Sequence, residues 1–578
     1  MPRKKISTLI LLVSEILALS AVTPAADLQP GKTQEGMLRE GKGPTFTLQL
    51  KGGDYVEAEA DLHNTELIIT VYAPAGNKFR AFRLDSDYGT QLRFIAEAPG
   101  MYRLEVAGQG KSKTGNFSIM LGKVMSVEER LSTAPPDELY ESARIKQLKA
   151  DLSAGKPDAV TRFWDEARAR TTPLLEPFAA DSRYVLATFL WQGNETTKNV
   201  FVELFPYVLA WPNDYSMTRL AETNVWYKTI KMHRQTRCVY RLIPNGTYFH
   251  TGRDRDLLKQ RVFFASGRTD PLNPRHWLHD PENPDNADYA DFSALEMPDA
   301  PPQPWIKPRA GVPTGMIETR RFKSTLLNNE RDLVIYLPAG YDKNARTPYG
   351  LVVFFDGYAY MPKGAEQPWI PGPTTLNNLI AEKRIPPVVG LFIDNPPGLR
   401  NPELACNLKF LDSLNAEMVP WVREHYNVTK DAKNTLVGGL SFGGLSAACA
   451  ALHHSETFGN VLSQSGGFSW SPPRNGEDLF ERMRANDPDD EPNWLTKQFI
   501  ENPRLPIRFY MTAGKDEFDA SGGGRDILTS SRHLRDVLLA KGYEVHYNEF
   551  YGGHDFLSWR GSMADGLIAL LGRSQTQK

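Results

Sequence analysis

The sequence predicts a multidomain protein in which two small all-β sandwich domains precede a larger C-terminal α/β domain. The 578 residues exceed what one hydrophobic core supports, so about three domains are expected. Apolar and polar residues alternate through 45–124, and further short strand patterns follow from 184 to 264, which is typical of sandwich strands. From Ile317 onward strand and helix patterns alternate, which is typical of a parallel sheet covered by helices.

The N-terminal residues 1–26 have the pattern of a secretory signal peptide. Basic Met1–Lys5 precedes the apolar run Ile6–Val22, and small residues end the segment near Ala26. Glu15 lies inside the apolar run and argues against a retained membrane helix, because a charge in a spanning segment is costly. We therefore expect a periplasmic or secreted protein that has no membrane contact after cleavage.

Charge and cysteine content exclude several classes. Lys+Arg at 67 nearly balances Asp+Glu at 69, so nothing in the overall charge favours nucleic acid as a partner. Cys238, Cys406 and Cys449 permit at most one disulfide and form no C-x-x-C pair, which excludes zinc-ribbon and thioredoxin-like sites. Cys449 is interpreted as a small buried side chain. No metal or organic cofactor is expected.

The first predicted domain spans 27–125 and contains short strands separated by turns such as Gly52–Asp54 and Ala98–Gly100. This pattern is similar to the pre-peptidase C-terminal-like modules of secreted hydrolases, which implies an accessory binding or spacer domain. A helical connector with a solvated charged face follows at 126–175. A second β sandwich is expected at 176–310, ending in a segment rich in proline, asparagine and aspartate.

The last predicted domain spans 315–578. Several of its strand patterns are continuous apolar runs, as expected for parallel strands buried on both faces. The expected strands are Leu333–Leu337, Leu351–Phe355, Val388–Ile393, Thr435–Val437, Arg508–Thr512 and Val545–Phe550. The expected helices are Asn378–Lys383, Phe410–Glu424, Leu445–His453 and Ser530–Lys541.

A nucleophile elbow is predicted at Ser441. The sequence Gly439-Leu-Ser-Phe-Gly443 joins an apolar strand to a run of small residues of helical length. A strand-to-helix turn this sharp crowds strand against helix, so glycines are required two residues away on either side of the serine. The pattern is short enough to occur by chance, and its context decides the interpretation.

An α/β-hydrolase needs a nucleophile, an acid and a histidine in that chain order. His554 lies in a glycine-rich loop after the last predicted strand, and we expect it to be the base. Asp516, Glu517 and Asp519 all follow the preceding strand, and either carboxylate length could hold the imidazole. The acid therefore remains open among these three residues.

Backbone amides are expected to complete the site. Phe442 would present its amide at the start of the helix after the elbow. The strand Leu351–Phe355 ends in Asp-Gly, which would place the amides of Gly357 and Tyr358 opposite Phe442. These residues form the predicted oxyanion hole.

Several longer motifs resemble the enterochelin (ferric enterobactin) esterase family, over roughly residues 180 to 573. They are Thr223–Trp226, Asp270–Pro274, Ser293–Pro298, Glu403–Asn407, Ser441–Ser446, Val461–Gly466 and Gly552–Arg560. The resemblance implies that Glu517 is the acid, that the second β region is a substrate-side domain, and that the substrate is a small molecule, the ester of a catecholate siderophore. Such a substrate, loaded with iron, is a bulky anion.

The resemblance further implies that Arg400, Arg560 and Trp559 contact the substrate, while Arg560 has an alternative role in a structural pair with a carboxylate. The signal peptide and the first β domain depart from the family. Two other functions are therefore considered: an exported acetyl or feruloyl esterase, and a glycan- or siderophore-binding protein without activity. The presence of Ser441 and His554 argues against the binding protein.

Overall fold

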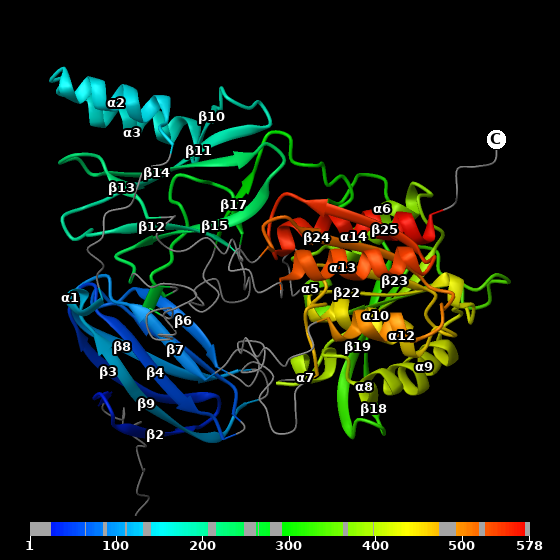
Figure 1. The fold of residues 1–578 in the computed structure, drawn as a ribbon. Helices are drawn as coiled ribbons and strands as arrows, with labels where there is room; N and C mark the ends of the chain where they lie inside the picture. The colour runs from blue at the N-terminus through cyan, green and yellow to red at the C-terminus, as the bar shows by residue number, and fades with distance from the viewer. Residues whose placement is uncertain are drawn as a thin grey trace, which may run out of the picture.

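The computed structural model describes three regions of folded chain between residues 25 and 572 (Figure 1). Within that span it leaves out 64, 85–89, 110–111, 131–139, 206–215, 248–261, 264, 278–291, 362–367, 397, 473–492 and 519–525. Residues 1–24 of the predicted signal peptide 1–26, and Asp519, one of the three candidate acids, therefore lie outside the described residues, while Ala26 already belongs to the first strand. Among the helices that are described, none is long and apolar enough to cross a membrane.

The first region is built from two packed β sheets, drawn in blue in Figure 1. One sheet has the order β1-β3-β8-β5-β6 and the other β2-β9-β4-β7. The alternating pattern of the sequence turns one face of each strand inward, where Ile69, Phe94 and Phe117 are fully buried. The strands are β1 Ala26–Asp27, β2 Thr33–Leu38, β3 Lys42–Leu50, β4 Tyr55–Asp61, β5 Leu67–Tyr72, β6 Lys78–Leu84, β7 Gln91–Ile95, β8 Gly100–Gly108 and β9 Gly115–Met125.

The second region also contains two sheets, in the orders β10-β11-β14-β13 and β12-β15-β17-β16. Its core includes Phe189, Val202 and Leu242. Three helices precede it: α1 Val127–Arg130, α2 Ala143–Ser153 and α3 Ala159–Arg170. The strands are β10 Leu174–Pro177, β11 Tyr184–Gln192, β12 Val200–Phe205, β13 Thr218–Arg219, β14 Val225–His233, β15 Arg237–Pro244, β16 His276–Trp277 and β17 Phe292–Glu296.

Helices α2 and α3 cover the first of these sheets, as Figure 1 shows. Phe163 and Trp164 of α3 pack in one cluster with Leu190 and Tyr227 of the sheet. The segment predicted as a helical connector is thus part of the second region's core, and only its charged face is solvated.

The first region is docked against the second. Tyr55, Ile95 and Met125 form a small buried cluster with Val262 and Ala265 of the second region. Glu97 and Arg268 add an ion pair of 3.5 Å across the same contact. The first region therefore packs against the second through a small apolar cluster and one ion pair.

The third region contains an eight-stranded sheet with the order β18-β19-β21-β20-β22-β23-β24-β25. The strands from β21 onward pair in parallel, whereas β18 and β19 are antiparallel at one edge. The strands are β18 Met316–Ser324, β19 Asn329–Leu337, β20 Gly350–Phe355, β21 Val388–Ile393, β22 Thr435–Leu440, β23 Asn460–Gln464, β24 Arg508–Gly514 and β25 Glu544–Phe550. Strands β18 and β23 were not predicted.

Helices cover both faces of this sheet (Figure 1). Helices α8, α9, α10, α12 and α13 bury side chains in the core on one face, and α5, α6 and α14 in the core on the other. The helical elements are α5 Gly357–Tyr360, α6 Gly372–Ala381, α7 Arg400–Leu404, α8 Leu408–Ser413, η2 Leu414–Met418, α9 Val419–His425, η3 Ala432–Asn434, α10 Phe442–His453, α12 Trp494–Glu501, α13 Ile527–Ala540 and α14 Phe556–Leu571.

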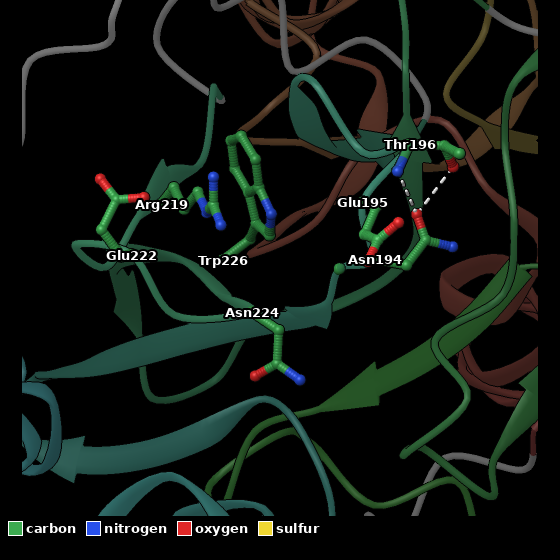
Figure 2. A pocket seen from close by; sticks show the side chains of 8 residues that line it. Asn194, Glu195, Thr196, Arg219, Glu222, Asn224 and Trp226 are labelled. Carbon is green, nitrogen blue, oxygen red and sulfur yellow. Dashed lines mark hydrogen bonds between the residues drawn. The ribbon is translucent and has the colours of Figure 1, made fainter.

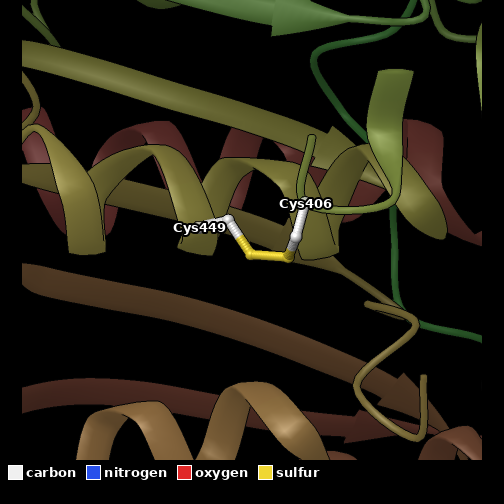
Figure 3. Close-up of a disulfide and its surroundings, with 2 residues drawn as sticks. All are labelled: Cys406 and Cys449. Carbon is white, nitrogen blue, oxygen red and sulfur yellow. A yellow bond between two sulfur atoms is a disulfide. The ribbon is translucent and has the colours of Figure 1, made fainter. Parts of the chain in front are cut away.

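A disulfide joins Cys406, which follows α7, to Cys449 in the middle of α10 (Figure 3). The two Cα atoms are 5.7 Å apart and the residues are 43 positions apart in the chain. Cys449 is fully buried, as predicted, and in addition it forms the one disulfide that the cysteine count permits, because α7 and α10 pack closely enough for the bond. Cys238 is free and buried.

Candidate active site

Ser441 lies in the turn between β22 and α10. Its backbone has φ 55° and ψ −122°, a conformation that non-glycine residues rarely adopt. The neighbours hold it there, because the Ser441 amide donates to the Gln464 carbonyl (2.9 Å) and the Gly467 amide donates to the Ser441 carbonyl (3.1 Å). A Cβ on Gly439 would lie 2.6 Å from the Gly443 carbonyl carbon, so only glycine fits at that position.

His554 and Glu517 form the second half of the site. Nδ1 of His554 is 2.6 Å from Oε1 of Glu517, whose side chain is only 1 % exposed. The Gly514 amide donates to the other oxygen of that carboxylate (2.5 Å). Because a carboxylate accepts, Nδ1 carries the hydrogen and Nε2 keeps the lone pair that a general base needs.

The three side chains follow parallel strands of one sheet. Ser441 comes after β22, Glu517 after β24 and His554 after β25. The carboxyl ends of parallel strands lie at one edge, which is where ligands bind in open α/β sheets.

Of the open candidates for the acid, Glu517 contacts His554. Its neighbour Asp516 is half-buried, and burial followed by the Glu517 charge raises the pKa of the Asp516 carboxyl. The structure therefore favours Glu517, the acid that the resemblance implied.

Trp559 is almost fully buried, with 2 % of the residue exposed, so the structure does not favour the predicted contact with substrate. Its ring meets His554 edge to face, with 4.6 Å between centroids and an angle of 87°. Its indole N–H donates to Ser465 Oγ (2.9 Å). Trp559 thus supports the histidine from the interior.

The guanidinium of Arg560 is engaged within the protein, and its predicted contact with substrate stays a prediction. Nε donates to Gln303 Oε1 (2.7 Å) and Nη2 to Glu296 Oε1 (3.1 Å). Both partners belong to the second region or to the chain that follows it. The alternative considered for Arg560, a structural pair with a carboxylate, is what the structure contains.

Arg400 likewise forms an internal pair. Nε and Nη2 donate to the two oxygens of Asp356 at 2.6 and 2.8 Å, and the Asp356 side chain is fully buried. Asp356 has φ 58° and directly precedes Gly357. Arg400 therefore helps to hold the turn after β20, and its predicted contact with substrate stays a prediction.

One of the predicted oxyanion donors is occupied. The Tyr358 amide donates to Oδ1 of Asp394 (2.6 Å), which does not favour its predicted role in the oxyanion hole. Phe442 begins α10 and Gly357 begins α5, and the amides of first helical residues have no partner within their own helix. These two amides remain the predicted donors.

The sequence interpretation missed Asp356 and Asp394 as supports of the site. Each is an aspartate at the end of a buried apolar strand, β20 and β21 respectively. A carboxylate in that position needs buried partners, and this was the available signal. Which donors satisfy it depends on tertiary structure.

A separate open pocket of about 630 Å³ lies at the end of β14 that is distant from the histidine loop. It is lined by Gly193, Asn194, Glu195, Thr196, Arg219, Glu222, Asn224 and Trp226, as Figure 2 shows. Oδ1 of Asn194 accepts from the amide and hydroxyl of Thr196 within it. Strand β14 has 9 residues. A strand of that length spans about 30 Å. The pocket is therefore remote from the His554 loop, which lies at the other end of β14.

The fold and site define the class of the C-terminal region, which is an esterase-type α/β domain. Residues 324–570 match the putative esterase family, and residues 186–306 match the N-terminal domain of enterochelin esterases. The chain belongs to the enterochelin esterase family.

Curated relatives cover most of the described chain. The iron(III) enterobactin esterase of Dickeya dadantii is 30 % identical over 432 residues, which are 71 % of this chain and 92 % of that protein. The iron(III) salmochelin esterase of Escherichia coli is 28 % identical over 437 residues, which are 74 % of this chain and 98 % of that protein.

Solved structures agree. The ferric enterobactin esterase of Salmonella typhimurium has a TM-score of 0.56 and 28 % identity, covering 70 % of this chain and 98 % of that one. The enterobactin esterase of Shigella flexneri, determined in the presence of enterobactin, has a TM-score of 0.53 and 29 % identity, covering 71 % and 97 %. The similarity therefore spans both the second and the third region.

Proposed function

We propose that this protein is a serine esterase that hydrolyses the ester bonds of a catecholate siderophore of the enterobactin type and so supports iron release. The observation that carries the proposal is the hydrogen bond between His554 and buried Glu517, at the same sheet edge as the strained Ser441. Relatives named for enterobactin and salmochelin esters match nearly their whole length.

In the proposed mechanism, Nε2 of His554 takes the proton of the Ser441 hydroxyl while the oxygen attacks an ester carbonyl. Glu517 keeps the imidazole in the required tautomer and stabilises its cationic form. The amides of Phe442 and Gly357 stabilise the oxyanion that forms. His554 then returns the proton to the leaving alcohol, and water releases the acid in a second cycle.

Iron takes no part in this mechanism and arrives only within the substrate. Because Arg400 and Arg560 are each paired with a carboxylate, we also consider other cations for the proposed anionic substrate. Lys515 is one candidate, as it lies two residues before Glu517 with its Nζ over the Tyr551 ring at 4.1 Å.

We also propose that the enzyme acts after export. The basic and apolar pattern of the N-terminal residues supports this, as does the disulfide between Cys406 and Cys449. Disulfides persist in oxidising compartments and are rare in the cytosol. Cell fractionation with antibody detection tests the proposal, and a protein confined to the cytosol would contradict it.

The decisive experiment compares substrates on the purified mature protein. Iron-free and ferric enterobactin are offered beside acetylated xylan, feruloylated xylan and a nitrophenyl ester, with Ser441→Ala as the blank. We expect the siderophore to be linearised far faster than the other esters. Cleavage of xylan or nitrophenyl esters alone would keep the serine esterase and remove the siderophore. Binding without cleavage would indicate a non-catalytic protein.

A further inference from the structure

The loop that bears His554 contacts a hairpin from another region of the molecule. This loop runs from Tyr551 to Asp555, between β25 and α14. The hairpin turn is residues 233–237, which join β14 to β15 in the second region. The Arg237 amide donates to the Tyr551 carbonyl (3.0 Å), and Ser558 Oγ of α14 donates to the Arg237 carbonyl (3.4 Å).

Gly552 is enclosed between the hairpin and the acid loop. A Cβ on Gly552 would overlap the Arg237 carbonyl oxygen, so the two backbones touch with no space for a side chain. On its other side, the Gly552 carbonyl accepts the Asp516 amide (3.1 Å), next to Glu517. The hairpin therefore packs directly against Gly552, which is hydrogen-bonded to the loop that bears Glu517.

A ring from the hairpin completes the contact. His233 stacks on Tyr551 with 3.5 Å between centroids and 6° between planes. Tyr184 of β11 meets the His233 ring edge-on at 5.4 Å. The histidine loop is thus held at its first residue by stacking and at its backbone by a hydrogen bond, both from outside the catalytic domain.

The hairpin is itself well anchored. Its turn is closed by backbone bonds from Met297 to Thr236 and from Asp299 to Arg234, each 2.9 Å. The Arg237 side chain bonds Glu296 through Nε (2.9 Å) and the Pro301 carbonyl through Nη2 (2.7 Å). Because the hairpin is held in place by these bonds, it can fix the position of the Tyr551–Asp555 loop that it contacts.

We propose that the hairpin turn His233–Arg237 is a positioning element for His554, with His233 as its positioning residue through the stack on Tyr551. It sets where the imidazole stands between Ser441 and Glu517. The expected change in kcat rests on the proposed esterase function, whereas the expected change in the position of His554 does not. A displacement of about 1 Å of a catalytic group costs about 100-fold in rate.

The test uses the full-length protein and three substitutions. His233→Ala removes the stack, His233→Phe keeps a flat ring on Tyr551, and Arg234→Ala is the matched control. Arg234 lies on the same turn, but its guanidinium contacts Asp299 rather than the loop. We expect His233→Ala to lower kcat by about 10- to 100-fold with KM nearly unchanged, His233→Phe to recover most of it, and Arg234→Ala to match wild type.

A second measurement does not need substrate. The proton between His554 and Glu517 should give a downfield NMR resonance that broadens or shifts in His233→Ala and is retained in His233→Phe and Arg234→Ala. An unchanged resonance together with an unchanged kcat in His233→Ala would overturn the inference. A wild-type protein that cleaves no ester would speak against the proposed function, while the resonance would still decide the inference.

Discussion

The two halves of the proposed site are supported differently. The Ser441 turn is held by residues of its own domain, Gln464 at the end of β23 and Gly467 just after it, and by tight glycine contacts within the elbow. The His554 loop is held partly by Arg237 and His233 of the second region. The position of the proposed nucleophile therefore comes from contacts within the α/β domain, whereas the loop of the proposed base also contacts the second region. Substitutions can test the supports of Ser441 and of His554 separately.

Ser441→Ala should have the largest effect, because it removes the nucleophile and leaves the other half intact. Ester turnover should fall by about 10⁴-fold or more, with an unchanged Tm. A serine-directed phosphonate should label the wild-type protein and should not label Ser441→Ala, because the reactive hydroxyl is absent. A variant that is still labelled would place the nucleophile elsewhere.

Glu517→Gln should have the next largest effect. The amide keeps the shape but not the charge that stabilises the imidazolium, so kcat should fall by about 100- to 10,000-fold. Asp516→Asn is the matched control from the adjacent position and should remain active. If Asp516→Asn were the more damaging change, the acid would be reassigned.

Removing the disulfide should affect stability rather than chemistry. The bond closes a chain segment of 43 residues that includes the elbow. Crosslinks of this span contribute about 3 to 4 kcal/mol. Cys449→Ala should therefore lower the denaturation midpoint while kcat at 25 °C changes little. A reducing agent should reproduce the shift in wild type and leave Cys449→Ala unaffected.

The smallest effect is expected from Asp555→Asn, as a change in pH dependence. Burial raises the pKa of Asp555 to about 7, and its Oδ1 accepts the Ser558 amide at the start of α14 (2.9 Å). A raised carboxyl pKa favours the protonated group in the folded state, so this contribution to stability is lost as pH rises from about 4 towards 7.

Asparagine keeps the capping oxygen and cannot ionise. The Tm of Asp555→Asn should therefore fall less than that of wild type between pH 5 and pH 8. Parallel Tm curves for the two proteins would show that Asp555 does not titrate in this range.

The α/β strands and the elbow could be predicted because they depend on local patterns. Continuous apolar runs marked β20, β21 and β24, and the glycine spacing marked Ser441. Strand β23, Asn-Val-Leu-Ser-Gln, was missed because its buried polar side chains interrupt the apolar run.

The substrate contacts could not be predicted in the same way. Arg400 and Arg560 were chosen for their charge, but their partners Asp356 and Glu296 lie 44 and 264 positions away in the chain. Pairings over such separations are decided by tertiary packing. The contact between His233 and Tyr551, which joins two regions, was outside the reach of sequence patterns for the same reason.

The small contact between the first and second regions determines whether the first region would stay bound after the chain is cut. Among the residues that the structure describes, its apolar contact with the second region comprises Tyr55, Ile95, Met125, Val262 and Ala265. Two separate molecules would associate weakly through so small a patch, but a covalent tether raises the local concentration to about the millimolar range. Proteolytic cleavage between α1 and α2 would remove that advantage. The first region would then dissociate by dilution.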